Sequence, residues 1–281
     1  MKRALVLSGG GAKGAYQVGA LMYLLGDLQR RYDVYCGISV GALNASFLSM
    51  FPSGLEKKAI HTLKDIWDNV DDRRIYKNRY PFLGTAISAA LSAISSKSLY
   101  DSSPLISLVH EKLDREKVAT SGKFLRVGAV SINTGIYRVW SEDSLSIKDA
   151  VLASSAFPLF FDPIEIDGEY WTDGGVREIA PVQQALDMGC THVDVVSLSE
   201  LDMQYFDANN TNLVKHGPRV LDIMATEVAL TDFNFNNPQN AEISILRPSR
   251  PLLKNSLDFS PSKIQRNFNL GYSEAKEHSW T

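Results

Sequence analysis

The first fifty residues contain the same local pattern twice: a short apolar strand, a glycine-bounded loop and a helix. The first copy begins with a predicted strand at Arg3–Leu7 and continues through a glycine loop into a helix over residues 15–28. The second has a strand at 33–36, then Gly37-Ile38-Ser39-Val40-Gly41, then a helix over 42–50. Consecutive strand–helix units predict a parallel sheet with helices on its faces.

The remaining sequence continues this alternation, without an internal repeat or an obvious linker. Asp167-Gly168 is a typical two-residue hairpin turn, and Pro181 suits the first turn of a helix that is capped by Gly189. Further strands are predicted at 124–130, 136–140, 192–198 and 243–246. We therefore expect an α/β fold with a mostly parallel central sheet, helices on both faces and one domain over residues 1–281.

Composition limits the classes of protein to which the chain can belong. It has 29 Lys and Arg against 32 Asp and Glu, a net charge of −3, and 44% hydrophobic residues, which predicts a core of ordinary size and no nucleic-acid binding. Cys36 and Cys190 lie in apolar segments, so we expect reduced thiols and a cytoplasmic protein. The acidic pair Asp71-Asp72 has no matching ligand spacing, and we expect no metal site.

The first glycine loop, residues 9–14, matches the pattern G-x-G-x-x-G between a strand and a helix. A dinucleotide-binding site would also need an acidic residue at the end of the second strand, where this chain has Gly37-Ile38-Ser39. A Walker A loop is excluded because Lys13 precedes its glycine and Ala15 replaces the required hydroxyl residue. The loop is therefore best explained as a set of backbone amides that bind an anion. A dinucleotide-binding oxidoreductase stays as the less favoured alternative.

The second loop has the pattern of a nucleophile elbow, with Ser39 two residues from a glycine on each side. Such a turn exposes the serine hydroxyl at the amino end of a helix. The simpler explanation is a glycine-rich turn with a helix-capping serine, which we consider less favoured. A serine also needs a base, yet none of the five histidines lies in an unusual loop.

A third glycine motif, Asp173-Gly174-Gly175, follows the second arm of the predicted hairpin. Its glycines permit another backbone to approach the carboxylate closely. Alone, this motif would indicate only a turn aspartate.

Together with Ala153-Ser154-Ser155-Ala156-Phe157-Pro158, these motifs occur in an order that resembles the patatin-like phospholipases. The resemblance covers residues 3–200, and a closing strand and helix at 240–275 are also similar. It implies a three-layer fold without a cofactor and a catalytic dyad in which Ser39 is the nucleophile and Asp173 accepts its proton. It further implies an oxyanion hole at Gly10, Gly11 and Ala12, and motif glycines at Gly9, Gly14, Gly37, Gly41, Gly174 and Gly175. One departure is Ile179-Ala180-Pro181, where many members have Asn-Pro after the aspartate motif.

The resemblance implies hydrolysis of carboxylic esters of fatty acids, with phospholipid or lysophospholipid as substrate. A noncatalytic lipid-binding regulator on the same fold is the alternative. Residues 81–96 carry no charge and are interpreted either as a lid or interfacial helix that meets a membrane, or as a packed helix. Phe157, Leu159, Phe160 and Phe161 could line an acyl pocket or belong to the core. Head group, acyl length and oligomeric state stay open.

Overall fold

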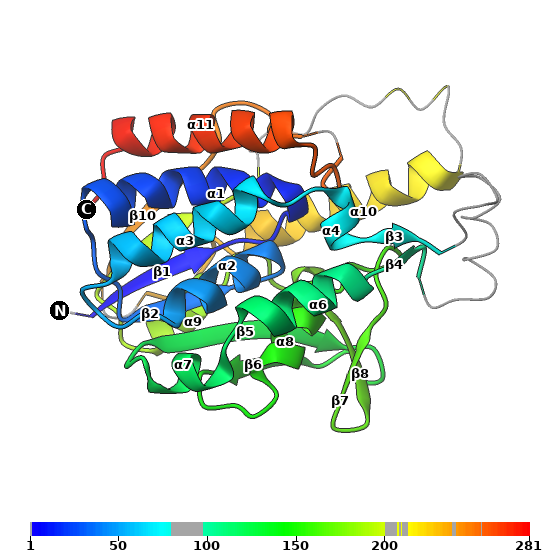
Figure 1. Cartoon of the computed structure of the whole chain (residues 1–281), viewed down its shortest axis with the longest axis horizontal. Coiled ribbons are helices and arrows are strands. Elements are labelled where there is room, and N and C mark those ends of the chain that lie inside the picture. Colours follow the sequence, from blue (N-terminus) through cyan, green and yellow to red (C-terminus); the bar gives the residue numbers. More distant parts are fainter. Residues whose placement is uncertain are drawn as a thin grey trace.

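The computed structural model describes residues 2–79, 98–199, 207, 209, 213–237, 240–253 and 255–281. Its centre is an eight-stranded sheet in which five neighbouring strands are parallel and three at one end are antiparallel (Figure 1). The parallel strands, in spatial order, are β10 (Glu242–Leu246), β9 (His192–Val196), β1 (Arg3–Leu7), β2 (Val34–Gly37) and β5 (Phe124–Ser131). The antiparallel strands are β6 (Tyr137–Ser141), β8 (Glu169–Asp173) and β7 (Ile164–Ile166). A separate two-stranded sheet pairs β3 (Lys77–Asn78) with β4 (Tyr100–Asp101).

Helices cover the central sheet on both faces. Those whose buried side chains join the larger hydrophobic core are α1 (Gly14–Leu21), which continues as a π-helical segment (Met22–Asp27), α2 (Val40–Ser49), α3 (Glu56–Asp68), α4 (Asp72–Ile75), α6 (Ser103–Lys112), α7 (Arg115–Thr120), α8 (Ile147–Ser154) and α11 (Pro261–Glu277). The opposite face is covered by α9 (Val182–Asp187). The remaining long helix is α10 (Leu213–Thr231). None of the described helices is both long and apolar enough to cross a bilayer.

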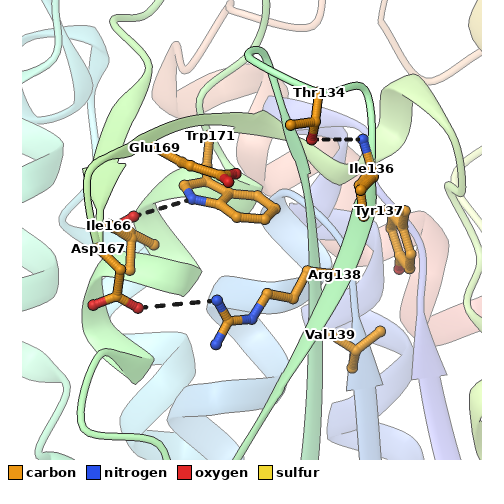
Figure 2. Close-up of a pocket in the computed structure, with 9 residues that line it drawn as sticks. All are labelled: Thr134, Ile136, Tyr137, Arg138, Val139, Ile166, Asp167, Glu169 and Trp171. Atoms are coloured by element: carbon orange, nitrogen blue, oxygen red, sulfur yellow. Dashed lines mark hydrogen bonds and ion pairs between the residues drawn. The ribbon is translucent and has the colours of Figure 1, made fainter.

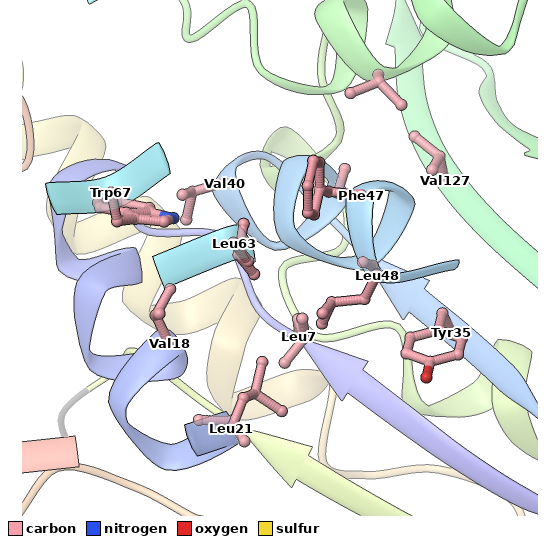
Figure 3. Packing of buried hydrophobic residues seen from close by; sticks show 14 of the residues in the cluster. Leu7, Val18, Leu21, Tyr35, Val40, Phe47, Leu48, Leu63, Trp67 and Val127 are labelled. Carbon is pink, nitrogen blue, oxygen red and sulfur yellow. The ribbon is translucent and has the colours of Figure 1, made fainter. Parts of the chain in front are cut away.

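The alternation of side chains along β1 explains why two cores form. Leu5 and Leu7 point into the larger core with α1, α2 and α3, whereas Ala4 and Val6 pack against α9 on the other face. Figure 3 shows the larger core, where Leu7 lies among side chains of the surrounding helices. Strands buried on both faces need continuous apolar sequence, which is why the short run before the first glycine loop is uncharged after Arg3.

The helix α11 packs alongside α1, at the top of the view in Figure 1. Two glycines make this close packing feasible. A Cβ added to Gly19 would lie 2.0 Å from the Phe268 carbonyl oxygen, and one added to Gly271 would lie 2.0 Å from the Tyr16 carbonyl oxygen. The backbones of the two helices therefore approach as closely as glycine allows.

The predicted fold class is confirmed, and each predicted strand is present within two residues at either end. The Asp167-Gly168 turn joins β7 to β8 with positive φ at both residues, 55° and 82°, as a type I′ hairpin requires. The helix predicted over residues 15–28 changes from α to π geometry at Met22. The predicted lid or packed helix at 81–96 lies outside the described residues, and the single-domain assignment stays a prediction.

Candidate active site

Ser39 occupies the sharp turn between β2 and α2. Its φ of 55° and ψ of −127° are unusual for a residue with a side chain, and this conformation projects the hydroxyl from the turn. The flanking glycines are sterically required. A Cβ on Gly37 would lie 2.3 Å from the Gly41 carbonyl oxygen, and one on Gly41 would lie 2.1 Å from the Leu7 carbonyl oxygen. The elbow predicted from the sequence therefore forms with the expected backbone geometry.

The register of the sheet brings Asp173 to this elbow. β2 pairs with β5 through Gly37 opposite Val127, and β8 pairs with β5 through Asp173 opposite Ala129. Because β6 takes the other edge of β5, β2 and β8 must share one edge. β8 runs toward β2 and ends beside it. A Cβ on Gly174 would accordingly lie 3.1 Å from the Ile38 side chain and 2.4 Å from the Gly128 carbonyl oxygen.

The Asp173 carboxyl is buried, with 3% of the residue exposed. Its Oδ1 accepts a hydrogen bond of 2.8 Å from the Gly175 amide. Burial raises the pKa of the carboxyl from 3.8 to about 7, and the Gly175 amide and the Ser39 hydroxyl oppose this rise as hydrogen-bond donors. A carboxyl with a pKa of about 7, beside a hydroxyl, can act as a general base near neutral pH.

The first glycine loop lies against the same elbow. A Cβ on Gly9 would be 3.2 Å from the Cβ of Ser39, and one on Gly10 would be 2.8 Å from the Leu198 side chain. Gly9 donates its amide to the Ile179 carbonyl oxygen at 3.0 Å. The amides of Gly10 and Gly11 have no hydrogen-bond acceptor in the part of the chain that the structure describes. Unpaired backbone donors at the start of a helix can bind an anion.

Ala12, the third residue predicted for the oxyanion hole, differs from these two glycines. Its amide donates a 2.7 Å hydrogen bond to the Ser256 carbonyl oxygen, so in this conformation it is already paired. The same carbonyl oxygen would be 2.2 Å from a Cβ on Gly11, which has a φ of +58°. The chain around Ser256 therefore determines which amides of the loop stay available.

Sequence reasoning missed two groups that support the loop. One is the Ser256 carbonyl, which no side-chain motif could reveal. The other is Asp232, whose Oδ2 accepts hydrogen bonds from the amides of Ile179 at 2.6 Å and Ala180 at 2.8 Å. Since the Ile179 carbonyl in turn accepts the Gly9 amide, Asp232 holds the segment that anchors the glycine loop. Asp232 lies just after α10 in no recognisable motif.

The histidines near the sheet lie away from Ser39. His192 begins β9, opposite Arg3 at the start of β1, and its Nε2 is 3.4 Å from a carboxylate oxygen of Glu242. His278 pairs with the Ser244 hydroxyl at 3.2 Å, in the chain that follows α11. His192 lies at the amino end of a parallel strand, whereas the elbow follows the carboxyl end of β2. The two are therefore at opposite ends of the parallel strands.

The four apolar residues at the end of the Ala153–Pro158 motif and just after it divide between the acyl-pocket and core interpretations. Phe161 belongs to the core, whereas Leu159 is 57% exposed. Phe157 and Phe160 are partly buried and stack with ring centroids 5.3 Å apart. A cavity of about 10 Å³ behind Ser155 has room for one water molecule rather than an acyl chain.

A larger groove, of about 510 Å³, opens between β6 and the β7–β8 hairpin (Figure 2). Arg138 crosses it, 4.7 Å from the Trp140 ring and 3.9 Å from a carboxylate oxygen of Asp167. Its charge is thus balanced within the groove. The groove is lined by neither the proposed catalytic residues nor the glycine loop, and its lining consists of Thr134, Ile136, Tyr137, Arg138, Val139, Ile166, Asp167, Glu169 and Trp171.

Comparison with known proteins found relatives of low sequence identity. The chain is 23% identical over 209 residues to the uncharacterized protein YjjU of Escherichia coli strain K12, an alignment that covers 72% of this chain and 53% of YjjU. The chain thus spans about half the length of that relative. Among solved structures, it is similar to VipD from Legionella pneumophila, with a TM-score of 0.47, 16% identity and coverage of 98% of this chain and 66% of VipD. It is also similar to the type III effector protein ExoU, with a TM-score of 0.39, 12% identity and coverage of 98% and 52%.

The family model for patatin-like phospholipases matches residues 5–186, which is more than half of the chain and includes the first glycine loop, the elbow at Ser39 and the Asp173-Gly174-Gly175 motif. On this match, the chain belongs to the patatin-like phospholipase family.

Proposed function

We propose that the protein is a serine acyl hydrolase that cleaves carboxylic esters of fatty acids through a dyad of Ser39 and Asp173. The observation that carries this proposal is the placement of a buried carboxyl, with a pKa of about 7, beside a serine in a strained elbow. The two residues are distant in sequence, and neither the elbow nor the hairpin requires them to meet. Their juxtaposition is what a base-activated nucleophile needs.

The proposed reaction has two stages. In the first, Asp173 accepts the Ser39 hydroxyl proton as Oγ attacks the ester carbonyl, and the protonated carboxyl then returns that proton to the leaving alcohol. In the second, Asp173 accepts a proton from water, which attacks the acyl-serine and releases the fatty acid. A carboxyl with a pKa near 7 suits both directions of transfer, since neither its charged nor its neutral form is strongly disfavoured.

The negative charge that develops on the carbonyl oxygen needs donors in both stages. We assign this role to the amides of Gly10 and Gly11, which are unpaired within the described chain and belong to the loop that contacts Ser39. Ala12 could join them only after its amide leaves the Ser256 carbonyl oxygen. The oxyanion hole is therefore proposed as two amides rather than three in this conformation.

The substrate class that we propose is phospholipid or lysophospholipid. It is supported by membership of the patatin-like phospholipase family and by the partly exposed apolar residues Phe157, Leu159 and Phe160, at the end of the Ala153–Pro158 motif and just after it. Contact with a lipid surface is part of the same proposal. A regulator that binds lipid without cleaving it remains the competing function, and it would need no reactive serine.

The decisive test is covalent labelling with a fluorophosphonate, which reacts with activated serines. We expect labelling of the wild type, none of Ser39→Ala, and a loss of at least about 100-fold in rate for Asp173→Asn. Ser49→Ala is a matched control, because Ser49 is a buried serine at the far end of α2 from Ser39, and its hydroxyl donates to the Ser46 carbonyl oxygen at 2.8 Å.

Hydrolysis of lysophospholipid and of short nitrophenyl esters by the same four proteins then tests the substrate class. Wild-type protein that binds lipid vesicles but neither labels nor hydrolyses any ester would support the regulator instead. Full activity of Asp173→Asn would remove this residue from the mechanism.

A further inference from the structure

Three consecutive residues at the carboxyl end of α8 contact both members of the proposed dyad. They are Ser154, Ser155 and Ala156. The first two hydrogen-bond to the backbone of Ser39, and the third to the backbone of Asp173. This tripeptide thus spans the gap between the two loops.

On the Ser39 side, the two hydroxyls are not equivalent. The Ser39 amide donates to Ser154 Oγ at 3.0 Å, which is its acceptor in the described structure. The Ser39 carbonyl oxygen accepts from Ser155 Oγ at 3.2 Å, but it also accepts the amides of Ala42 at 2.9 Å and Leu43 at 3.2 Å in the first turn of α2. Losing Ser155 would leave the carbonyl paired, whereas losing Ser154 would leave a partly buried amide without its acceptor in the described structure.

On the Asp173 side, the contact is a backbone carbonyl. The Ala156 carbonyl oxygen accepts the Asp173 amide at 3.1 Å and the Thr172 hydroxyl at 2.7 Å. The end of β8 is thereby fixed to the same short segment that holds the elbow. Because Ser154 is fully buried at the end of a helix packed on β5, it is a rigid point of attachment.

We propose that Ser154 is a positioning residue, which holds the Ser39 backbone in its strained turn and so sets the distance from the Ser39 hydroxyl to the Asp173 carboxylate. The inference rests on the proposed acyl hydrolase function. A residue with a side chain at positive φ stays there only when its surroundings fix it, and the Ser154 hydroxyl supplies the bond to the amide on the strained residue itself. Small displacements of reacting groups reduce the rate strongly.

The test compares Ser154→Ala, Ser154→Thr and Ser155→Ala in the full chain, with Ser49→Ala as the control for loss of a buried serine hydroxyl. We expect Ser154→Ala to lower kcat for ester hydrolysis about 10- to 100-fold with KM changed less than about twofold, and to slow fluorophosphonate labelling by the same factor. Ser154→Thr, which keeps the hydroxyl, should recover most of the rate. Ser155→Ala should lose less than Ser154→Ala, and Ser49→Ala should match the wild type.

The outcomes separate this proposal from the one on which it rests. A wild type that neither labels nor hydrolyses esters contradicts the proposed function. An active wild type together with a Ser154→Ala protein of equal kcat overturns the positioning role, and so do equal losses in folded Ser154→Ala and Ser154→Thr. If Ser154→Ala does not melt cooperatively, Ser154→Cys takes its place, because sulfur is a weaker acceptor of similar size. Wild-type kcat in that variant would likewise overturn the proposal.

Discussion

At the scale of single residues, the chemistry depends on how burial raises the pKa of one carboxyl, that of Asp173. Asp173 loses contact with water at the end of β8, and within the described residues the Gly175 amide and the Ser39 hydroxyl are the donors to its carboxylate. In water an aspartate is too weak a base to deprotonate a serine at useful rates. Its pKa of about 7 in the fold makes the carboxylate more basic by about three orders of magnitude in proton affinity.

The pH dependence of the rate should therefore report Asp173. The base must be ionised to accept the Ser39 proton, so we expect kcat/KM for a neutral ester to rise about tenfold per pH unit below an apparent pKa of about 7 and to level off above it. Initial rates from pH 5 to pH 9 measure this directly. A kcat/KM that falls only near pH 4, the range of an ordinary aspartate, would contradict the assignment.

The same shift predicts how Asp173 affects stability. Its pKa is higher in the folded protein, about 7, than the ordinary 3.8, so the folded state binds the proton more tightly and stability falls as the pH rises between these values. Asp173→Asn removes the buried charge and can keep the bond from the Gly175 amide. With about 1.4 kcal/mol per pKa unit, we expect it to stabilise the protein by about 2–4 kcal/mol at pH 8 and by little at pH 4. Urea unfolding at the two pH values measures this difference, and a variant less stable at pH 8 would contradict it.

At the scale of elements, the packing of α11 on α1 supports the helix that follows the glycine loop. Tyr16 of α1 donates its hydroxyl to a carboxylate oxygen of Glu274 in α11 at 2.6 Å, and the two helices touch at Gly19 and Gly271. Since α1 begins at Gly14, directly after the proposed oxyanion loop, this packing fixes the element from which the loop extends.

Gly19→Ala should accordingly destabilise the protein by at least about 2–3 kcal/mol, because its methyl group would lie 2.0 Å from a backbone oxygen of α11 that cannot move alone. Gly26→Ala is the matched control, since a Cβ there meets nothing closer than 3.9 Å. Thermal and urea unfolding of both variants compare the two sites. Equal stability of Gly19→Ala and Gly26→Ala would show that the helices can separate without cost.

At the scale of the whole molecule, the site combines elements from nearly the full described chain. The family model ends at residue 186, yet the Ser256 carbonyl that pairs Ala12 and the Asp232 carboxylate that holds Ile179 both come from later residues. The strands β9 and β10 also follow that point, and β9 pairs directly with β1. The segment outside the family match is thus part of the support for the glycine loop, not an appendage.

The sequence by itself determined the local pieces. The strands, the first glycine loop and the elbow at Ser39 follow from apolar runs, turn residues and the few backbone conformations that permit a tight strand-to-helix turn. All of these act over about ten residues or fewer. The family resemblance supplied the pairing of Ser39 with Asp173, which no local pattern contains.

Only the tertiary structure decided the rest. The shared edge of β5, which brings β8 to β2, arises from long-range strand register, and the raised pKa of Asp173 arises from burial by residues scattered along the chain. The hydrogen bonds from the Ala12 amide to the Ser256 carbonyl and from the Ser39 amide to the Ser154 hydroxyl depend on how elements distant in sequence pack together. Hydrogen bonds of this kind cannot be recognised from the sequence, because a backbone carbonyl or a single hydroxyl is compatible with almost any local pattern. Its partner is set by the elements that pack against it.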